Sequence, residues 1–291
     1  MRLRAERRRA WLVLLAAALL FAGCSGDDDA GSLARARKEG TIRVGFANEP
    51  PYAYLESASG RLTGESPEIA RAVLKQMGVG EVEGVLTEFG SLIPGLKAGR
   101  FDVIAAGMYI LPERCKEIAF SNPTYSVGAA FIVARGNPRK LHSYADVARN
   151  PHARLAVVAG AVERSYARES RIPDERIIVF PDAPSGLEGV RAGRADAFAG
   201  TSLTVNSLLA RADSDALERA APFKDPVIEG KRVRGYGAFG FRKEDRKLID
   251  AFNKGLAQYI GSPAHLETVK PFGFTAAELP QGATAAALCA G

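Results

Sequence analysis

The chain has 291 residues, of which 47% are hydrophobic and 25% charged, a composition typical of soluble globular proteins. Its length suits one large domain or two lobes of about 100–150 residues each. The formal net charge is +6, but the five arginines and one glutamate of the first 23 residues supply +4 of it, which leaves about +2. No basic block interleaved with aromatic residues follows, so the composition argues against nucleic-acid binding.

The N-terminus is organised like a secretory leader. An arginine-rich start precedes the uncharged apolar run Ala10–Ala22, which is too short to span a bilayer comfortably and is typical of a signal-peptide core. Phe21-Ala22-Gly23-Cys24 resembles a lipobox, with Phe in place of the usual leucine. We therefore expect residues 1–23 to be removed, Cys24 to carry the lipid and residues 24–40 to form a flexible tether. This predicts an extracytoplasmic protein anchored to the cell membrane; the alternative is an uncleaved membrane anchor.

The remaining chain contains two more cysteines, Cys115 and Cys289. They either form a disulfide or stay unpaired, because two thiols alone do not decide between these states. The three histidines show no metal-ligand spacing. We expect neither a metal nor a cofactor.

Mixed α/β elements follow in chain order. Thr41–Phe46 alternates and is rich in strand-forming residues, which predicts a first strand. Pro67–Met77 carries apolar residues at helical spacing, and Val85–Leu86 predicts a further strand. Near the end of the chain, helices are predicted over Arg246–Ile260 and Pro263–Val269.

An internal repeat indicates the architecture. Leu96–Gly107 (LKAGRFDVIAAG) has a counterpart in Val190–Gly200 (VRAGRADAFAG). Each copy predicts a helix end, a glycine just beyond it, a turn and a short buried strand that ends in glycine. The repeat therefore predicts two α/β lobes built on the same plan.

The chain is expected to pass between the lobes twice, through the glycine-bearing runs Ser126–Val133 and Gly235–Phe241, which would form a hinge. We assign residues 41–128 and 236–280 to lobe 1, 129–235 to lobe 2, and 281–291 to a C-terminal tail. Ligands of open α/β sheets bind beyond the carboxyl ends of the strands. A cleft between the lobes is therefore expected at four loops, Glu49–Tyr54, Met108–Arg114, Gly160–Glu163 and Gly200–Ser202.

With these features in place, the chain resembles a known family. Over about residues 35–275 it is similar to the family 3 solute-binding proteins of ABC transporters, which have the two-lobed type 2 periplasmic binding fold and serve polar amino acid importers. The motifs that carry the resemblance are Glu49-Pro50-Pro51-Tyr52, Leu92–Leu96 with Gly99–Asp102, Pro112-Glu113-Arg114, Phe120–Tyr125 and Gly193–Ala197. The resemblance implies a monomeric, non-enzymatic carrier that captures a small zwitterionic solute by lobe closure and docks on an ABC permease.

Three stretches also resemble the ectoine- and hydroxyectoine-binding members of this family, namely Gly45–Glu49, Gly84–Leu96 and Ala105–Cys115. They imply one of these compatible solutes as the ligand. The alternative ligand is a polar or basic amino acid. A less favoured alternative is a secreted cyclohexadienyl-type dehydratase that uses a cleft carboxylate as general acid.

The resemblance assigns a carboxylate anchor to the cleft. Arg114 occupies the place of the family arginine, whose guanidinium forks onto the ligand carboxylate with two hydrogen bonds. The alternative is an exposed arginine paired with a neighbouring glutamate. Gly160, Val162 and Glu163 open a helix, where free backbone N–H groups would bind the same carboxylate, although the threonine usual in this turn is absent. Glu163 also offers a carboxylate to the ligand.

The other end of the ligand would meet aromatic rings. Tyr52, Phe89 and Tyr109 come from three cleft loops and are expected to face a diffuse cation, at about 0.5–2 kcal/mol per contact; the alternative is that they are core residues. Glu49 would accept a ligand N–H, or is a solvated turn acid. Thr201 lies where amino-acid-binding relatives place an aspartate, which favours a flat, delocalised cation over an α-ammonium group.

Overall fold

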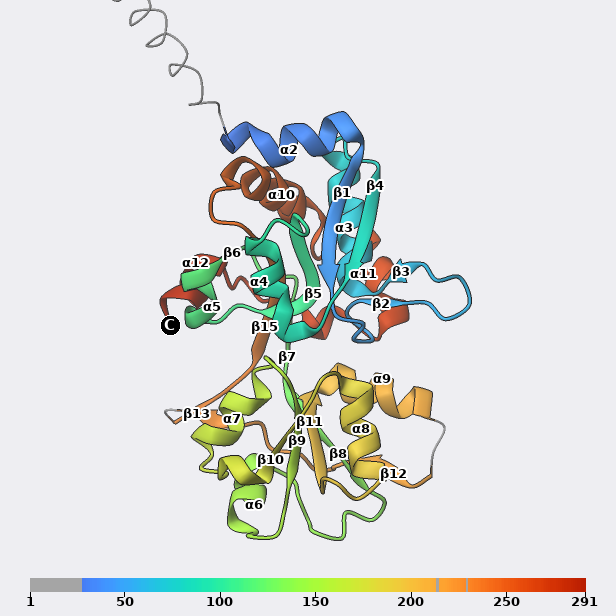
Figure 1. Ribbon diagram of the computed structural model, residues 1–291, viewed down its shortest axis with the longest axis vertical. Coiled ribbons are helices and arrows are strands. Elements are labelled where there is room, and N and C mark those ends of the chain that lie inside the picture. Colours follow the sequence, from blue (N-terminus) through green and yellow to red (C-terminus); the bar gives the residue numbers. More distant parts are fainter. Residues whose placement is uncertain (1–27, 213–214, 229) are drawn as a thin grey trace, which may run out of the picture.

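The computed structural model describes residues 28–291 except 213, 214 and 229, and it shows two α/β lobes stacked along the long axis (Figure 1). The predicted leader and Cys24 lie outside the described residues. Within the described part of the chain, no helix is long and apolar enough to cross a membrane.

Lobe 1 is built on a mixed sheet of order β4-β1-β5-β15-β6, in which β7 also pairs with β15. Strands β4, β1 and β5 are parallel neighbours, and β15 runs antiparallel to β5. The strands of this lobe are β1 (Thr41–Phe46), β4 (Glu81–Leu86), β5 (Val103–Tyr109), β6 (Ala119–Phe120), β7 (Tyr125–Val127) and β15 (Gly235–Phe241), with a separate hairpin of β2 (Tyr54–Leu55) and β3 (Leu62–Thr63).

Lobe 2 repeats this plan with the sheet order β10-β9-β11-β8-β12. Here β10, β9 and β11 are parallel and β8 runs antiparallel to β11, so β11 takes the place that β5 takes in lobe 1. Strands β5 and β11 are the two copies of the sequence repeat, and the prediction of two lobes on one plan is confirmed. The strands are β8 (Ala129–Ala134), β9 (Leu155–Val158), β10 (Ile177–Phe180), β11 (Ala197–Thr201) and β12 (Leu217–Arg219), with the hairpin β13 (Val227–Ile228) and β14 (Lys231–Arg232) beside them.

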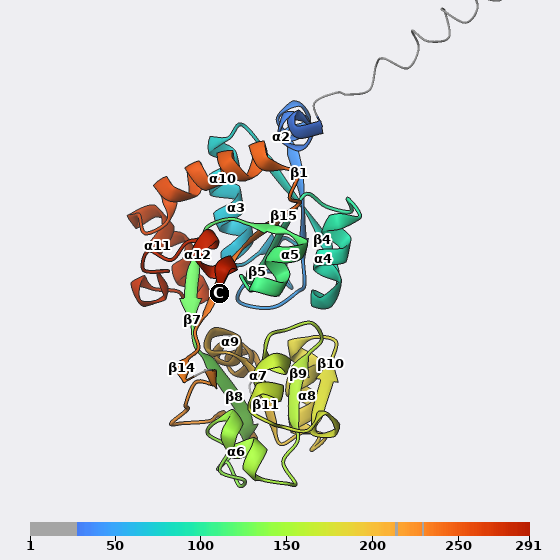
Figure 2. The ribbon, with the colours of Figure 1, turned by 90° about the vertical axis from the view of Figure 1, so that its left-hand side faces the viewer.

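Helices cover both faces of each sheet (Figures 1 and 2). In lobe 1, alternate residues of β5 point to opposite faces: Val103 and Ala105 belong to the cluster under α3, whereas Ile104 and Ala106 belong to the cluster under α4. The helices are α2 (Asp28–Glu39), α3 (Glu65–Gln76), α4 (Leu92–Lys97), α5 (Pro112–Glu117), α6 (Tyr144–Arg149), α7 (Glu163–Glu169), α8 (Ala183–Arg191), α9 (Ser202–Ala212), α10 (Arg246–Tyr259), α11 (Pro263–Val269) and α12 (Ala285–Ala290). Short 3₁₀ turns are η1 (Phe89–Ser91), η2 (Asp174–Arg176), η3 (Lys270–Phe272) and η4 (Ala276–Glu278).

The crossings between the lobes are shorter than the sequence suggested. Strand β7 ends in the lobe 1 sheet at Val127, and β8 begins in the lobe 2 sheet at Ala129, so only Gly128 separates them. The return path lies between β14 and Gly235. Most of the two predicted crossing runs is therefore strand inside a sheet, which confines the flexible link to a few residues.

The described part of the predicted tether is helical instead of flexible. Residues 28–39 form α2, in which Leu33 and Ala36 are buried against lobe 1. Arg35 pairs with the buried Asp102 at 2.7 Å, and Ser32 donates to Asp245 at 2.6 Å. Apolar burial and ion pairing thus dock this segment, which corrects the expectation of a free tether through residue 40.

The predicted C-terminal tail also belongs to lobe 1. Its helix α12 packs on α5, and Cys289 forms a disulfide with Cys115 across 174 positions of sequence. The pairing that the sequence left open is therefore resolved by the fold, which brings the two Cα atoms to 5.7 Å.

Candidate functional site

A small pocket lies between the lobes, where the sequence placed the cleft. Gly107 and Ala161 line it together with seven of the nine candidate residues. These seven are Glu49, Tyr52, Phe89, Tyr109, Arg114, Val162 and Glu163. The remaining two candidates, Gly160 and Thr201, are hydrogen-bonded to lining residues. All nine residues are thus brought together from separate loops of the two lobes.

Arg114 is buried in the cleft, with 9% of its surface exposed. Its Nη1 donates to the carbonyl oxygen of Tyr109 at 2.9 Å, and its Nη2 donates across the cleft to the carbonyl oxygen of Gly160 at 2.9 Å. The guanidinium carbon lies 5.6 Å from the centroid of the Phe89 ring. Burial lowers the pKa of Arg114, whereas Glu113 and Glu163 raise it. The alternative of an exposed surface arginine is wrong.

The backbones of the two lobes touch beside this arginine. Gly160 has a φ of +76°, and a Cβ at this position would come within 2.6 Å of the Cα atom of Gly90 in lobe 1. Any other residue at 160 would be strained in backbone and in space. The glycine therefore allows its carbonyl oxygen to reach Arg114 at the start of α7.

A chain of hydroxyl contacts joins the lobes on the other side of the pocket. Tyr52 Oη donates to Thr201 Oγ1 at 2.8 Å, and Thr204 Oγ1 donates to Glu49 Oε1 at 2.9 Å. Thr201 Oγ1 also accepts from the backbone N–H of Thr204 at 3.0 Å, which is a helix-cap contact at the start of α9. Thr204 was missed by sequence reasoning; its place three residues after the cap was the available signal.

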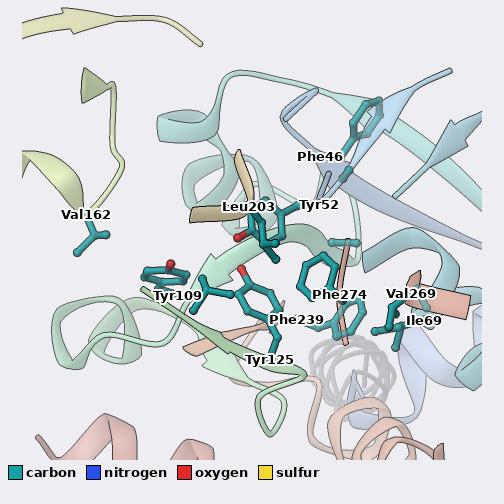
Figure 3. Packing of buried hydrophobic residues seen from close by; sticks show 14 of the residues in the cluster. Phe46, Tyr52, Ile69, Tyr109, Tyr125, Val162, Leu203, Phe239, Val269 and Phe274 are labelled. Atoms are coloured by element: carbon teal, nitrogen blue, oxygen red, sulfur yellow. The ribbon is translucent and has the colours of Figure 1, made fainter. Parts of the chain in front are cut away.

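Two of the three candidate aromatics, Tyr52 and Tyr109, belong to the core (Figure 3), whereas Phe89 is only partly buried and packs against it. Tyr52 stacks on Tyr125 at 5.1 Å between ring centroids, and Tyr109 meets Tyr125 edge-on at 6.3 Å. In Figure 3, Tyr109 lies between Tyr125 and Val162 of the opposite lobe. One aromatic cluster thus forms both the floor of the pocket and part of the core.

Two carboxyl groups of the pocket are shifted toward neutrality. Burial raises the pKa of Glu49 to about 7, against the opposing hydrogen bond from Thr204. Burial also raises the pKa of Glu163 to about 7, with Glu49 raising it further and Arg114 lowering it. Because the free carboxyls titrate near neutral pH, a cation placed between them would favour their ionised forms.

The pocket offers little room in this conformation, about 30 Å³. The cross-lobe contacts of Arg114, Tyr52 and Thr204 close its sides. A solute of amino-acid size therefore enters only when the lobes separate, which breaks these contacts and frees their polar atoms for the solute.

A buried acid beneath the pocket was also missed by sequence reasoning. Glu65, at the start of α3, is 1% exposed and accepts hydrogen bonds from Thr124 at 2.7 Å and from Ser66 at 2.6 Å. Ser66 in turn accepts from the backbone N–H of the pocket residue Gly107 at 3.2 Å. No pattern in the sequence distinguishes Glu65 from an ordinary first-turn acid, because its burial depends on packing between distant strands.

Replacing Glu65 by glutamine is expected to flatten the pH dependence of stability. Burial raises the pKa of Glu65 from its ordinary 4.5 to about 7. The folded protein therefore holds an extra proton between these values. This extra proton stabilises the folded state fully below pH 4.5, and the stabilisation is lost as pH rises through 7. For this pKa shift the free energy of unfolding falls by roughly 3 kcal/mol. Urea unfolding of both proteins from pH 5 to 8 should show the variant gaining relative stability as pH rises. If the free energy of unfolding changed with pH in the same way in both proteins, the raised pKa of Glu65 would be contradicted.

Residues 42–274 match the model of the bacterial extracellular solute-binding proteins, family 3. This match covers more than half of the chain.

The chain belongs to this family of solute-binding proteins.

Its relatives include a probable amino-acid ABC transporter periplasmic-binding protein of Sinorhizobium fredii, 39% identical over 84% of this chain and 80% of the relative. The lysine/arginine/ornithine-binding periplasmic protein of Escherichia coli is 29% identical over 75% of this chain and 82% of its own. A crystal structure of EhuB in complex with hydroxyectoine superposes with a TM-score of 0.81 at 36% identity, covering 90% of this chain and 98% of that one. Another similar structure is the ancestral amino acid-binding protein AncCDT-1, a precursor of cyclohexadienyl dehydratase, with a TM-score of 0.72 at 28% identity, covering 83% and 99%.

These relatives fix the general type of the chain. It is a solute-binding protein of the ABC-transporter type with the two-lobed type 2 periplasmic binding fold. The relatives from Sinorhizobium fredii and Escherichia coli are both periplasmic binding proteins.

Proposed function

We propose that this family 3 protein binds ectoine or hydroxyectoine between its lobes and delivers it to an ABC permease. The observation that carries the proposal is the last residue of β11, Thr201, which is neutral and already hydrogen-bonded to Tyr52 and to the start of α9. By the resemblance to the family, amino-acid-binding members have an aspartate at the position of Thr201, which pairs with the α-ammonium group of the ligand. The structural likeness to EhuB, which was solved with hydroxyectoine, supports the same ligand class.

Ligand capture would use the pocket groups in two sets. Arg114, already oriented by Tyr109, would exchange its bond with Gly160 for the ligand carboxylate and form a bidentate pair. At the other end, Glu49 and Glu163 would accept the N–H groups of the ring. The rings of Tyr52 and Tyr109 would cover the flat, delocalised cation, which avoids burying a poorly paired ammonium group.

A polar or basic amino acid is the second candidate ligand. The chain is 39% identical to a probable amino-acid-binding relative and 29% identical to the lysine/arginine/ornithine-binding protein. Two acids and one arginine also suit a ligand with one carboxylate and two cationic groups. A dehydratase is less favoured, since the named relatives are binding proteins.

The carrier is proposed to act as a monomer that stays at the cell membrane. Cys24 would carry the lipid outside the cytoplasm, after removal of residues 1–23. Lobe closure about Gly128 and the segment before Gly235 would then present the loaded form to the permease. Mass spectrometry of the protein purified from the membrane fraction should find Cys24 as the first residue and carrying the lipid, and an intact leader or an unmodified Cys24 would contradict this part of the proposal.

Titration calorimetry tests the ligand directly. The chain starting at Ser25 is titrated with ectoine, hydroxyectoine, glutamine and arginine; heat is the readout because the only tryptophan, Trp11, lies in the predicted leader. We expect tight binding of the two ectoines alone. Binding of glutamine or arginine without a response to the ectoines would assign the protein to the amino-acid carriers instead.

A further inference from the structure

The C-terminal helix α12 is attached covalently next to the proposed carboxylate anchor. Cys289 in α12 is bonded to Cys115, the residue that directly follows Arg114 in α5. Figures 1 and 2 show the end of the chain lying against α5. The family model ends at residue 274, so α12 and its cysteine lie beyond the segment that defines the family.

Helix α5 has little to hold it in place by itself. It is six residues long, and Leu111, the residue at its N-cap, makes no side-chain cap hydrogen bond. Arg114 is its only buried residue. Because so short a helix is marginal without tertiary contacts, its register depends on neighbouring segments. One of these contacts is a hydrogen bond from Lys243 to the carbonyl oxygen of Lys116 at 2.6 Å; the covalent one is the bond at Cys115.

Helix α12 covers the outer side of this region. Ala285, Leu288 and Cys289 are half-buried against the lobe 1 cluster that includes Ile118. The backbone N–H of Ala285 donates to Asn122 Oδ1 at 3.1 Å. None of the residues of α12 is fully buried. The disulfide is therefore the strongest link that keeps α12 against α5.

We propose that the Cys115–Cys289 disulfide and α12 form a clamp that sets the position of α5 and so aims Arg114 at the ligand carboxylate. The inference rests on the proposed role of Arg114. A bidentate pair of parallel hydrogen bonds requires one orientation of the guanidinium, so a displaced Arg114 would lose part of this pair. Cys115 and Cys289 are thus positioning residues that touch no ligand. Breaking their bond weakens binding while the fold persists.

A double-mutant cycle on the full chain, purified in mild detergent, tests the clamp. Cys289→Ser is made in the native background and in Arg114→Lys, and binding of hydroxyectoine, or of L-arginine if that is the solute bound, is measured by calorimetry. We expect Cys289→Ser to raise the Kd about 10-fold beside Arg114 and less than about 2-fold beside lysine, whose ammonium has no fork to misalign. Cys115→Ser should have the same Kd as Cys289→Ser, and the variant with both substitutions should bind no more weakly, because all three proteins lack the same disulfide.

Leu256→Ala is the matched control. Leu256 is buried in α10, away from α5, so its loss destabilises lobe 1 without moving Arg114. Its Kd should remain that of the wild type. The clamp would be overturned, with the proposed function intact, if Cys289→Ser left the Kd unchanged. It would also be overturned if Cys289→Ser weakened binding equally in the native and the Arg114→Lys backgrounds. A wild-type protein that binds none of the four solutes would overturn both.

Discussion

Replacing Arg114 by alanine is expected to raise the Kd for the bound solute about 100-fold or more. The guanidinium is buried, already oriented by the carbonyl of Tyr109, and placed to form two hydrogen bonds with a carboxylate. Truncating one partner of a buried, hydrogen-bonded charge pair costs about 2–5 kcal/mol, because the other charge is left unpaired. Calorimetry with the solute identified by the four-ligand panel measures the change.

Two further variants separate the causes of that loss. Arg114→Lys keeps the charge but loses the fork, so it should bind at an intermediate level. Arg168→Ala is the matched control: Arg168 is exposed on α7 and pairs with Asp174 through two hydrogen bonds of 2.8 Å. Such surface pairs contribute about 0–1 kcal/mol to stability, and the Kd should not change. A folded Arg114→Ala protein with wild-type affinity would refute the anchoring role.

Replacing Phe101 by alanine is expected to lower the free energy of unfolding by about 3–5 kcal/mol. The ring of Phe101 is fully buried in the turn that leads into β5, the repeated strand of lobe 1. The ring fits against two glycines. A Cβ atom added to Gly45 would lie 2.4 Å from the Phe101 ring, and one added to Gly95 would lie 2.8 Å from it. Neighbours that are mostly backbone cannot relax into the space, so a cavity remains. Urea unfolding at pH 7 measures the loss.

The other copy of the repeat explains why this position matters in lobe 1 alone. Lobe 2 has Ala195 in place of Phe101. There the buried ring is Phe198, which packs on Gly186 so closely that a Cβ atom added to this glycine would lie 2.4 Å from the ring. The control Val227→Ala lies at a position that is 63% exposed and should change stability by less than about 0.5 kcal/mol. An equally small effect of Phe101→Ala would show that the core closes around the missing ring.

Local pattern in the sequence was sufficient for most elements and for the two-lobe plan. The strand Thr41–Phe46 and the helix Pro263–Val269 have the predicted bounds, because alternation and helical spacing record which face of each element is buried. The repeat identified β5 and β11 as equivalent strands, since the same turn and the same buried strand require the same residue types. Family motifs then placed the nine candidate residues on the loops that meet in the cleft.

Contacts between distant segments were decided by the tertiary structure alone. The pairing of Cys115 with Cys289, the burial of Glu65 and the bond from Thr204 to Glu49 each join elements far apart in sequence. No local periodicity records such contacts, because they depend on how whole sheets and helices pack. For the same reason α2 and α12, whose short sequences suggested a tether and a tail, are held as ordered parts of lobe 1 by the surface they cover. The sequence by itself therefore determined the family, the lobes and the lining of the cleft, whereas long-range packing determined how those residues are held and charged.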